Sequence, residues 1–102
     1  MNIQIRNGFR FQWDEEKNRV NKKKHGVSFE EAITVFYDED SVLIPDPDHS
    51  DREERFIIMG MSLKAEVLTV VHCLRDHETI IRIISARKAT RNEKKQYFER
   101  KN

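Results

Sequence analysis

The sequence is poor in cysteine, glycine and proline, with one, three and two of these residues among 102. The single Cys73 cannot form an intramolecular disulfide, and its apolar surroundings indicate a small packed side chain in a reducing compartment. The widely spaced glycines exclude a glycine-rich phosphate loop. No apolar stretch approaches the ~18–20 residues of a membrane span, and MNIQIRNGF lacks the apolar core of a signal peptide. We therefore expect a soluble, cytoplasmic protein without a membrane partner.

Metal-ligand spacing is also missing. The four histidines include no pair at positions i and i+4, and the cysteine has no CxxC partner. No local motif joins a nucleophile to a histidine and an acid. The sequence therefore predicts no metal site and no cofactor.

The net charge of +1 conceals three regions of different sign. Residues 1–25 hold seven Lys/Arg and three Asp/Glu, residues 26–54 hold one and ten, and residues 55–102 hold eleven and five. The regional charges are therefore +4, −9 and +6. A polyanion is attracted to the two basic regions, whereas the acidic region is either a solvated loop or an attraction for a basic partner.

Capping signals locate the helices. Asp14 is followed by acidic residues, three lysines end the segment, and Gly26 stands where a left-handed residue closes a helix, which predicts a helix over 14–25. Ser28 with Glu31, and later Thr90 with Glu93, match the capping box. The first of these boxes begins a helix that ends near Tyr37, and the second begins a basic helix from Arg91 to about Arg100.

Apolar and aromatic runs locate the strands. They are FRFQW (9–13), SVLIP (41–45), Arg55–Met61, Val67–Leu74 and Ile80–Ala86. The run DPDHSD (46–51) is expected to be a loop, and the short links between the last strands suit antiparallel hairpins. The order β-α-α-β-β-β-β-α predicts one α+β domain over 1–102, with a meander sheet and helices packed against it.

Arg82 interrupts the apolar strand 80–84, where an unpaired buried guanidinium would cost several kcal/mol. It must therefore find a partner, for example Glu31, or open onto a cleft. Strict alternation places Arg82 on the face of Ala86 and Arg87 on the opposite face with Ser85, unless a bulge intervenes.

Two other polar residues of the predicted sheet, His72 and Arg55, each have two interpretations. His72 is either a functional group or a satisfied core histidine, and Arg55 is either a ligand-binding group or the partner of Glu53 or Glu54. The functional reading rests on several cations gathered on one small sheet without adjacent acids. Those cations are Arg82, Arg87, Lys88 and Arg91.

Three segments resemble one family. KHGVSFEEA (24–32), ERFIIMG (54–60) and RIISARKATRNEKKQYF (82–98), preceded by FQWDEEKNRVNKKKHG, closely resemble the BrnT toxins, in the same order, over nearly the whole chain. The resemblance implies a RelE-like fold, with two N-terminal helices and one C-terminal helix on an antiparallel sheet of four to five strands. It also implies a toxin that cuts RNA, arrests growth, and is neutralised by a DNA-binding antitoxin, BrnA, through which alone the pair would bind DNA.

RNA cleavage fits the missing metal motifs, because the RNA 2′-hydroxyl is itself the nucleophile and the enzyme need only orient it, stabilise charge on the phosphate and move protons. Arginines suit the phosphate, and a histidine or tyrosine suits proton transfer. The predicted catalytic residues are Arg82, Arg87, Arg55, His72 and Tyr97. The predicted ligands of flanking RNA phosphates are Lys22, Lys23, Lys24, Lys88 and Arg91.

Two other functions compete with this one. The two helices within 14–37 are spaced like a helix-turn-helix DNA-binding motif, although the second helix leads into the acidic run DED, which repels phosphates. The other alternative is a non-catalytic partner-binding module, such as a degenerate toxin.

Overall fold

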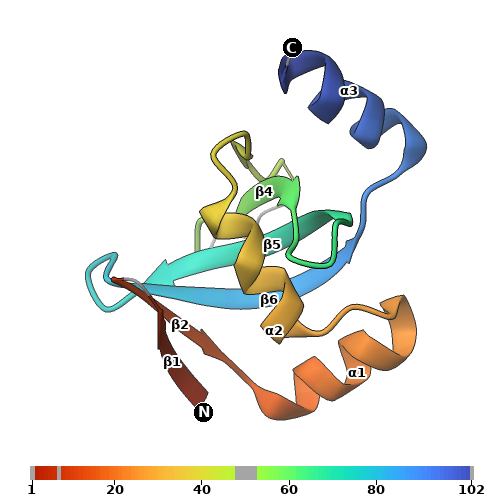
Figure 1. The fold of residues 1–102 in the computed structure, drawn as a ribbon. Coiled ribbons are helices and arrows are strands. Elements are labelled where there is room, and N and C mark those ends of the chain that lie inside the picture. The colour runs from red at the N-terminus through yellow and green to blue at the C-terminus, as the bar shows by residue number, and fades with distance from the viewer. Residues whose placement is uncertain (1, 7, 48–52, 102) are drawn as a thin grey trace.

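The computed structural model describes residues 2–6, 8–47 and 53–101, with side chains for 8–47 and 53–100. Within these residues the chain forms one six-stranded sheet with strand order β1-β2-β6-β5-β4-β3 and three α-helices (Figure 1). The elements are β1 (Asn2–Arg6), β2 (Phe9–Trp13), α1 (Glu15–His25), α2 (Phe29–Ala32), the 3-10 helix η1 (Ile33–Tyr37), β3 (Val42–Pro45), β4 (Phe56–Met61), β5 (Val67–Arg75), β6 (Ile80–Lys88) and α3 (Arg91–Lys101). Most of the predicted loop 46–51, with His49, lies outside the described residues.

The α+β class is confirmed, and β3, β4, β5 and β6 form the predicted antiparallel meander. The sheet differs from the prediction in two respects. β1 is an additional strand that forms a hairpin with β2, and β2 pairs with β6 in parallel, so the sheet is mixed. The hairpin has a sequence signal, because Gly8 has a φ of 89° and Asn-Gly is the dipeptide that two-residue hairpin turns favour.

The helix ends follow the predicted caps. Asp14 accepts hydrogen bonds from the backbone N–H groups of Glu16 and Lys17, and Gly26 closes α1 with a φ of 71°. Ser28 Oγ accepts from the backbone of Glu31 at 3.0 Å. The second predicted helix ends at Tyr37 as expected, but only its first turn is α-helical and the remainder is the 3-10 helix η1.

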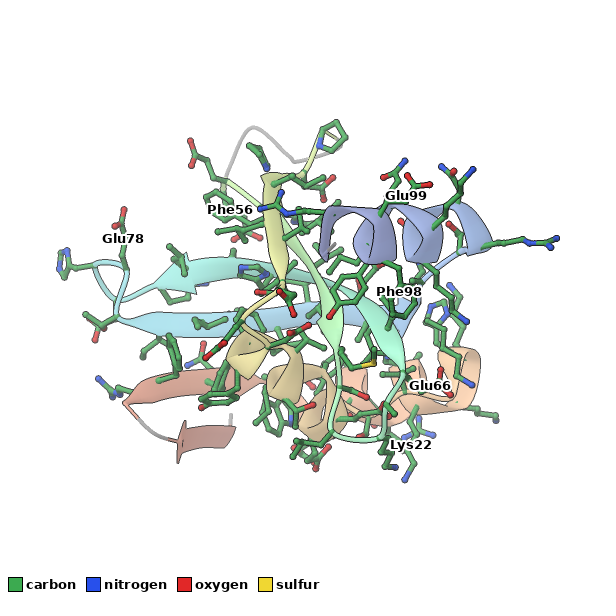
Figure 2. The ribbon with its side chains drawn as sticks, turned by 45° about the horizontal axis from the view of Figure 1, so that its top comes forward. Lys22, Phe56, Glu66, Glu78, Phe98 and Glu99 are labelled. Atoms are coloured by element: carbon green, nitrogen blue, oxygen red, sulfur yellow. The ribbon has the colours of Figure 1, made fainter. Side chains whose placement is uncertain are left out.

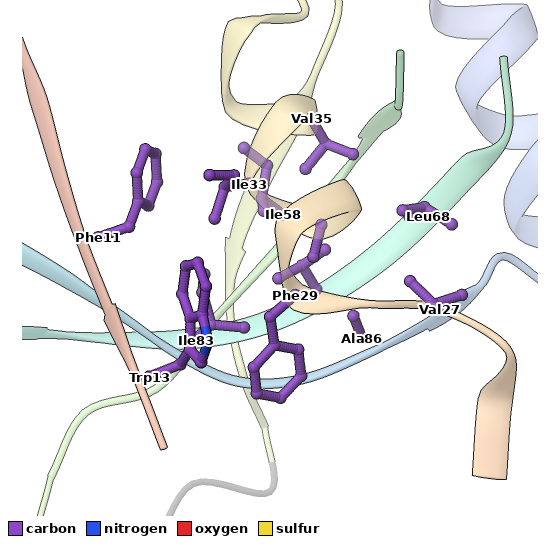
Figure 3. Packing of buried hydrophobic residues seen from close by; sticks show 12 residues of the cluster. Phe11, Trp13, Val27, Phe29, Ile33, Val35, Ile58, Leu68, Ile83 and Ala86 are labelled. Carbon is purple, nitrogen blue, oxygen red and sulfur yellow. The ribbon is translucent and has the colours of Figure 1, made fainter. Parts of the chain in front are cut away.

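One face of the sheet packs against α2 and η1, and we call it the covered face. β5 contributes Leu68 and Val70 to it. Figure 3 shows Leu68 together with the buried Phe29 and Ile33 of the helical segment. The apolar cluster as a whole consists of Phe11, Trp13, Val27, Phe29, Ala32, Ile33, Val35, Ile58, Leu68, Val70, Ile83 and Ala86. Burial of this cluster is the main apolar stabilisation of the fold.

Helix α1 is attached to this core through asparagines. Asn21 Nδ2 donates to the carbonyls of Val27 and Ala86, and Asn21 Oδ1 accepts from the N–H of Ala86 at 3.1 Å. β2 pairs with β6 only around Ile81 and Arg82, so within the described residues the backbone of β6 at Ala86 has no strand beside it on this edge. The Asn21 amide takes the place of that strand and bonds the N–H and carbonyl of Ala86. Asn18 accepts from the N–H of Phe29 and joins α1 to the start of α2.

Helix α3 lies on the other side of the sheet, which we call the open face. Tyr97 is 1% exposed and packs with Val67, Ala89 and the partly buried Met59. Figure 1 shows α3 where β6 finishes, well apart from α1, and Figure 2 shows Glu78 of the β5–β6 turn and Phe98 of α3 at opposite ends of the sheet. None of the helices in the described part of the chain has the length and apolar character of a membrane crossing.

Candidate active site

A β-bulge in β6 places Arg82 and Arg87 on the same face of the sheet. Residues opposite each other in paired strands point to the same side. Arg87 is opposite Thr69 and Arg82 is opposite Cys73, two residues that share the open face of β5. The register shifts because Ser85 is opposite Val71 while Ile83 is opposite His72, which leaves Ile84 as the extra residue. The sequence predicted opposite faces unless a bulge intervened, and the bulge is present.

The first group of charges on the open face surrounds Cys73. Arg82 Nη1 donates to Gln12 Oε1 of β2 at 3.2 Å. On the other side, Glu53 accepts from Arg75 at 2.9 Å and lies 3.5 Å from Arg55 Nε. Burial raises the pKa of the Cys73 thiol, with Glu53 acting in the same direction and Arg75 and Arg82 opposing it.

Within the part of the chain that the structure describes, this group holds the guanidinium groups of Arg55, Arg75 and Arg82 and the carboxylate of Glu53. The predicted alternative for Arg55, an ion pair with Glu53, is present. The alternative in which Arg82 pairs with Glu31 is wrong, because Glu31 lies on the other side of the sheet, where its carboxylate accepts from Ser62.

The second group joins Arg87 to α3. Arg87 donates from both terminal nitrogens to the Glu93 carboxylate, at 2.8 Å and 3.1 Å. Glu93 also accepts from Thr69 Oγ1 and from the N–H of Thr90, and the Thr90–Glu93 capping box is complete. The hydrogen bonds from Arg87 lower the pKa of Glu93 to about 2, with a further contribution from Thr90. Because the pair is formed, the expectation that no acid neutralises Arg87 is wrong.

His72 lies on the covered face, on the side of the sheet opposite to the arginines. It is 3% exposed, and its ring lies 5.0 Å from that of Phe36 and 6.0 Å from that of Phe56. Burial lowers its pKa to about 4, an effect that the Val70 backbone partly opposes. His72 contributes to the wall of an apolar hollow of about 230 Å³ on that face, together with the exposed Leu43. This environment matches a neutral core histidine.

Tyr97 lies beneath α3 and faces the sheet. Its hydroxyl donates to Asp38 Oδ2, which also accepts from the backbone N–H of Met61 at 2.7 Å. Burial raises the pKa of Tyr97, and the bond to Asp38 acts in the same direction. The hydroxyl thus ties α3 to the segment after η1. The predicted catalytic roles of Tyr97 and His72 stay predictions, and the structure does not bring either residue to the arginines around Cys73.

The predicted RNA-binding cations lie on two helices and at the end of β6. Lys22, Lys23 and Lys24 occupy the last turn of α1 and are exposed, and Lys24 lines a hollow with Ile84 and Ser85 at the edge of β6. Lys88 lies 3.9 Å from Glu66, so the expectation that it has no adjacent acid is also wrong. Arg91 begins α3 and is exposed.

Two further expectations concern site types. In residues 8–47 and 53–100, no three His, Cys, Asp or Glu side chains gather as a metal site would require. A helix-turn-helix is excluded, because its recognition helix must be exposed to enter the DNA groove. Helix α2 has only four residues, and three of them, Phe29, Glu31 and Ala32, are buried.

Gln12 and Glu93 were missed as site residues by sequence reasoning. Gln12 contacts Arg82 through the parallel pairing of β2 and β6, which no local pattern predicts. Glu93 was predicted only as a capping residue, and its place in the first turn of α3, six residues after Arg87, is the sequence signal for their contact.

Comparison with solved structures places this arrangement in a known class of fold. The chain superposes on the 1.1 Å crystal structure of the Brucella abortus ribonuclease toxin BrnT with a TM-score of 0.54 and 22% sequence identity, covering 79% of this chain and 96% of that one. This likeness shows the fold. No curated protein sequence matches the chain.

The family is shown by a sequence model. The model of the ribonuclease toxin BrnT of type II toxin–antitoxin systems matches residues 13–93, which span α1 to the first turn of α3. The chain belongs to the BrnT family of ribonuclease toxins. Membership implies an RNA target and an antitoxin partner.

Proposed function

We propose that this chain is a metal-independent endoribonuclease whose substrate lies on the open face of the sheet, with the scissile phosphate at Arg82. The observation that carries the proposal is the bulge at Ile84, which puts Arg82 and Arg87 on one face. Arg55 and Arg75 extend the cationic surface on the far side of Cys73. Among the described side chains, three guanidinium groups and the carboxylate of Glu53 lie here, and guanidinium groups match the geometry and charge of a phosphodiester.

The chemistry requires no nucleophile from the protein. The 2′-oxygen of the RNA forms a bond to the adjacent phosphorus, the bond from phosphorus to the 5′-oxygen breaks, and a proton moves from the 2′-hydroxyl to the leaving oxygen by way of solvent or a side chain. Arg82 and Arg55 stabilise the charge that develops on the phosphate, and Gln12 holds the Arg82 guanidinium in position. Arg87 is held by Glu93 and orients the neighbouring part of the RNA.

Proton transfer was assigned to His72 and Tyr97 in the sequence-based hypothesis. For His72 to act, the RNA would have to reach the covered face, and a neutral imidazole with a pKa of about 4 accepts protons weakly at neutral pH. Tyr97 would first have to release Asp38. We therefore place the main contribution of this chain in orientation and charge stabilisation by the arginines.

Flanking phosphates would meet the basic last turn of α1. Lys24 and Ser85 line the same hollow beside β6, which offers a path from the open face to the lysines. Lys88 and Arg91 extend the basic surface at the start of α3. We further propose that the antitoxin is a DNA-binding, BrnA-like protein, that the toxin reaches DNA only through it, and that both act in the cytoplasm to inhibit translation.

Replacement of Arg82 by alanine tests this proposal. We expect cleavage of single-stranded RNA to slow by about 100-fold or more, as with loss of one charge-stabilising donor in other enzymes. Arg19→Ala, which removes an exposed guanidinium paired with Glu16 on α1, is the matched control and should retain the wild-type rate. A chelator should leave the rate unchanged, and a 2′-deoxy substitution at the cut site should abolish cutting.

Two results would count against the proposal. A folded Arg82→Ala protein with full activity would remove Arg82 from the site. Purified wild-type protein that cuts no RNA, with or without ribosomes, would favour a non-catalytic partner-binding module.

A further inference from the structure

The open face has a second recess beside the cationic group around Cys73. Strands β3 and β4 and helix α3 enclose a hollow of about 160 Å³. Its floor consists of Val42, Ile44, Ile57 and Met59, and its wall on the α3 side includes Glu93 and Gln96. Ile44 is 47% exposed, so apolar surface in this hollow is accessible from solvent.

Charge distinguishes the hollow from the neighbouring arginine group. Glu93 at the hollow wall is paired with Arg87 through two hydrogen bonds, so this end of the face carries compensated charges. Around Cys73, by contrast, the described side chains hold three guanidinium groups and one carboxylate. A ligand that spans both places therefore needs an anionic part at one end and a neutral, largely apolar part at the other.

The strand register gives the distance between the hollow and the cationic group around Cys73. Ile57 of the hollow is opposite Val71, two residues from Cys73 along β5, and two residues of a strand span about 7 Å. Thr69, which also lines the hollow, is four residues from Cys73, or about 13 Å. Arg55, which directly precedes β4, is two residues from Ile57 or about 7 Å along the strand, whereas Arg82 lies on β6, two strand spacings or about 10 Å across the sheet from β4.

From this arrangement we propose that the hollow binds one unpaired nucleobase of the RNA, on the Arg55 side of the cationic group that holds the scissile phosphate. The base would lie on the floor formed by Ile44, Ile57 and Met59, with its polar edge toward Thr69 and Gln96. Proteins that bind single strands hold unstacked bases mostly on aromatic side chains, and pockets that receive a base turned out of the stack also use apolar side chains. A base in a duplex is stacked and paired and cannot enter, so the substrate class is single-stranded RNA. This inference rests on the proposed ribonuclease function for the identity of the ligand.

Affinity for an RNA that cannot be cut provides the test. The probe is a short single-stranded RNA in which every 2′-hydroxyl is methylated, so that it can be bound but not cut. A protein that binds the base in this RNA but cuts no unmodified RNA would contradict the ribonuclease proposal alone. Each nucleotide in turn is made abasic, and binding is measured by fluorescence anisotropy. We expect one position at which loss of the base weakens binding by about tenfold, toward the lower end of the range for a base on an aromatic side chain, because the floor here is aliphatic.

Two variants of strand β3 locate that base. Ile44→Ser reduces the apolar floor, and Leu43→Ser changes the neighbouring residue, which is 60% exposed and faces the other side of the sheet. In Ile44→Ser the intact RNA should bind about threefold to tenfold more weakly, and the abasic position should cost little more, because both changes remove the same contact. In Leu43→Ser both the affinity and the tenfold abasic effect should remain.

Two outcomes would overturn the inference. Abasic substitution without effect at every position would show that no base is bound. An abasic effect of the same size in wild type and folded Ile44→Ser protein would place the bound base elsewhere.

Discussion

Glu93 joins α3 to the sheet, and its replacement by glutamine measures how strongly. The carboxylate accepts two hydrogen bonds from Arg87, one from Thr69 and one from the Thr90 backbone. Glutamine keeps the shape and one acceptor oxygen but loses the charge. The folded protein should therefore lose stability, chiefly through weaker attraction to Arg87.

The pKa of Glu93 gives the size of the effect. A decrease from the ordinary value of 4.5 to about 2 corresponds to about 3 kcal/mol at 1.36 kcal/mol per pH unit. The side chains of Arg87 and Glu93 are 41% and 27% exposed, and solvent screening reduces the expected loss in Glu93→Gln to about 1–2 kcal/mol. Because the pKa is lowered in the folded state, this contribution is complete above pH 4.5 and is lost as the pH falls through about 2.

Urea unfolding of the variant and wild type at neutral pH, and at intervals from pH 4.5 to pH 2, measures the difference. Glu99→Gln is the matched control, since Glu99 lies on the same helix and forms an exposed pair with Lys95. The difference between Glu93→Gln and wild type should shrink across this interval, and the control should show little difference at any pH. Equal effects of the two substitutions, or a Glu93→Gln difference that persists undiminished in acid, would refute the reasoning.

Two further predictions concern stability. Asn21→Ala leaves the N–H and carbonyl of Ala86 and the carbonyl of Val27 without their partner, and should lower the free energy of unfolding by about 3 kcal/mol in urea titrations, whereas the exposed Asn92→Ala should change little. An equal effect at both positions would contradict the bridging role of Asn21. The pKa of His72 is lowered by burial from 6.5 to about 4, so wild-type stability should fall by about 3 kcal/mol as the pH decreases through that interval, because the unfolded chain takes up a proton that the folded chain refuses. His72→Phe should flatten this part of the pH profile, and an unchanged slope would show that other groups produce it.

The elements that follow from local chemistry were predictable from the sequence. Asp14 and Gly26 mark the ends of α1, and the capping boxes at Ser28 and Thr90 mark two more helix starts, because these side chains bond within their own turn. β1 was missed, although Asn7-Gly8 before an aromatic run carried a hairpin signal. The parallel pairing of β2 with β6 depends on chain segments far apart in sequence, and no local pattern specifies it.

The candidate site was predictable in its residue types but not in its geometry. The sequence identified Arg82, Arg87 and Arg55 as the cations to consider, and the structure places all three on the open face. Their common face depends on one extra residue at Ile84, and alternation alone cannot show a bulge. For His72 the sequence could not choose between a functional group and a core histidine, because apolar neighbours along the strand are compatible with both. The packing of its ring against Phe36 and Phe56 favours the core histidine.

The asparagine attachment of α1 has a thermodynamic consequence. The residues that α1 buries are Asn18 and Asn21, while its Val20 is 47% exposed. Detachment of this helix would therefore uncover little apolar surface, and both the heat-capacity increment and the urea dependence of that local opening should be small. Amide protons of α1 should then exchange by an opening that urea hardly promotes, while those of β5 exchange only when the apolar cluster is exposed. The lysines at the end of α1 thus lie on a helix that is held mainly by directional hydrogen bonds. Loss of those bonds should detach the helix more readily than a solvent that weakens apolar contacts.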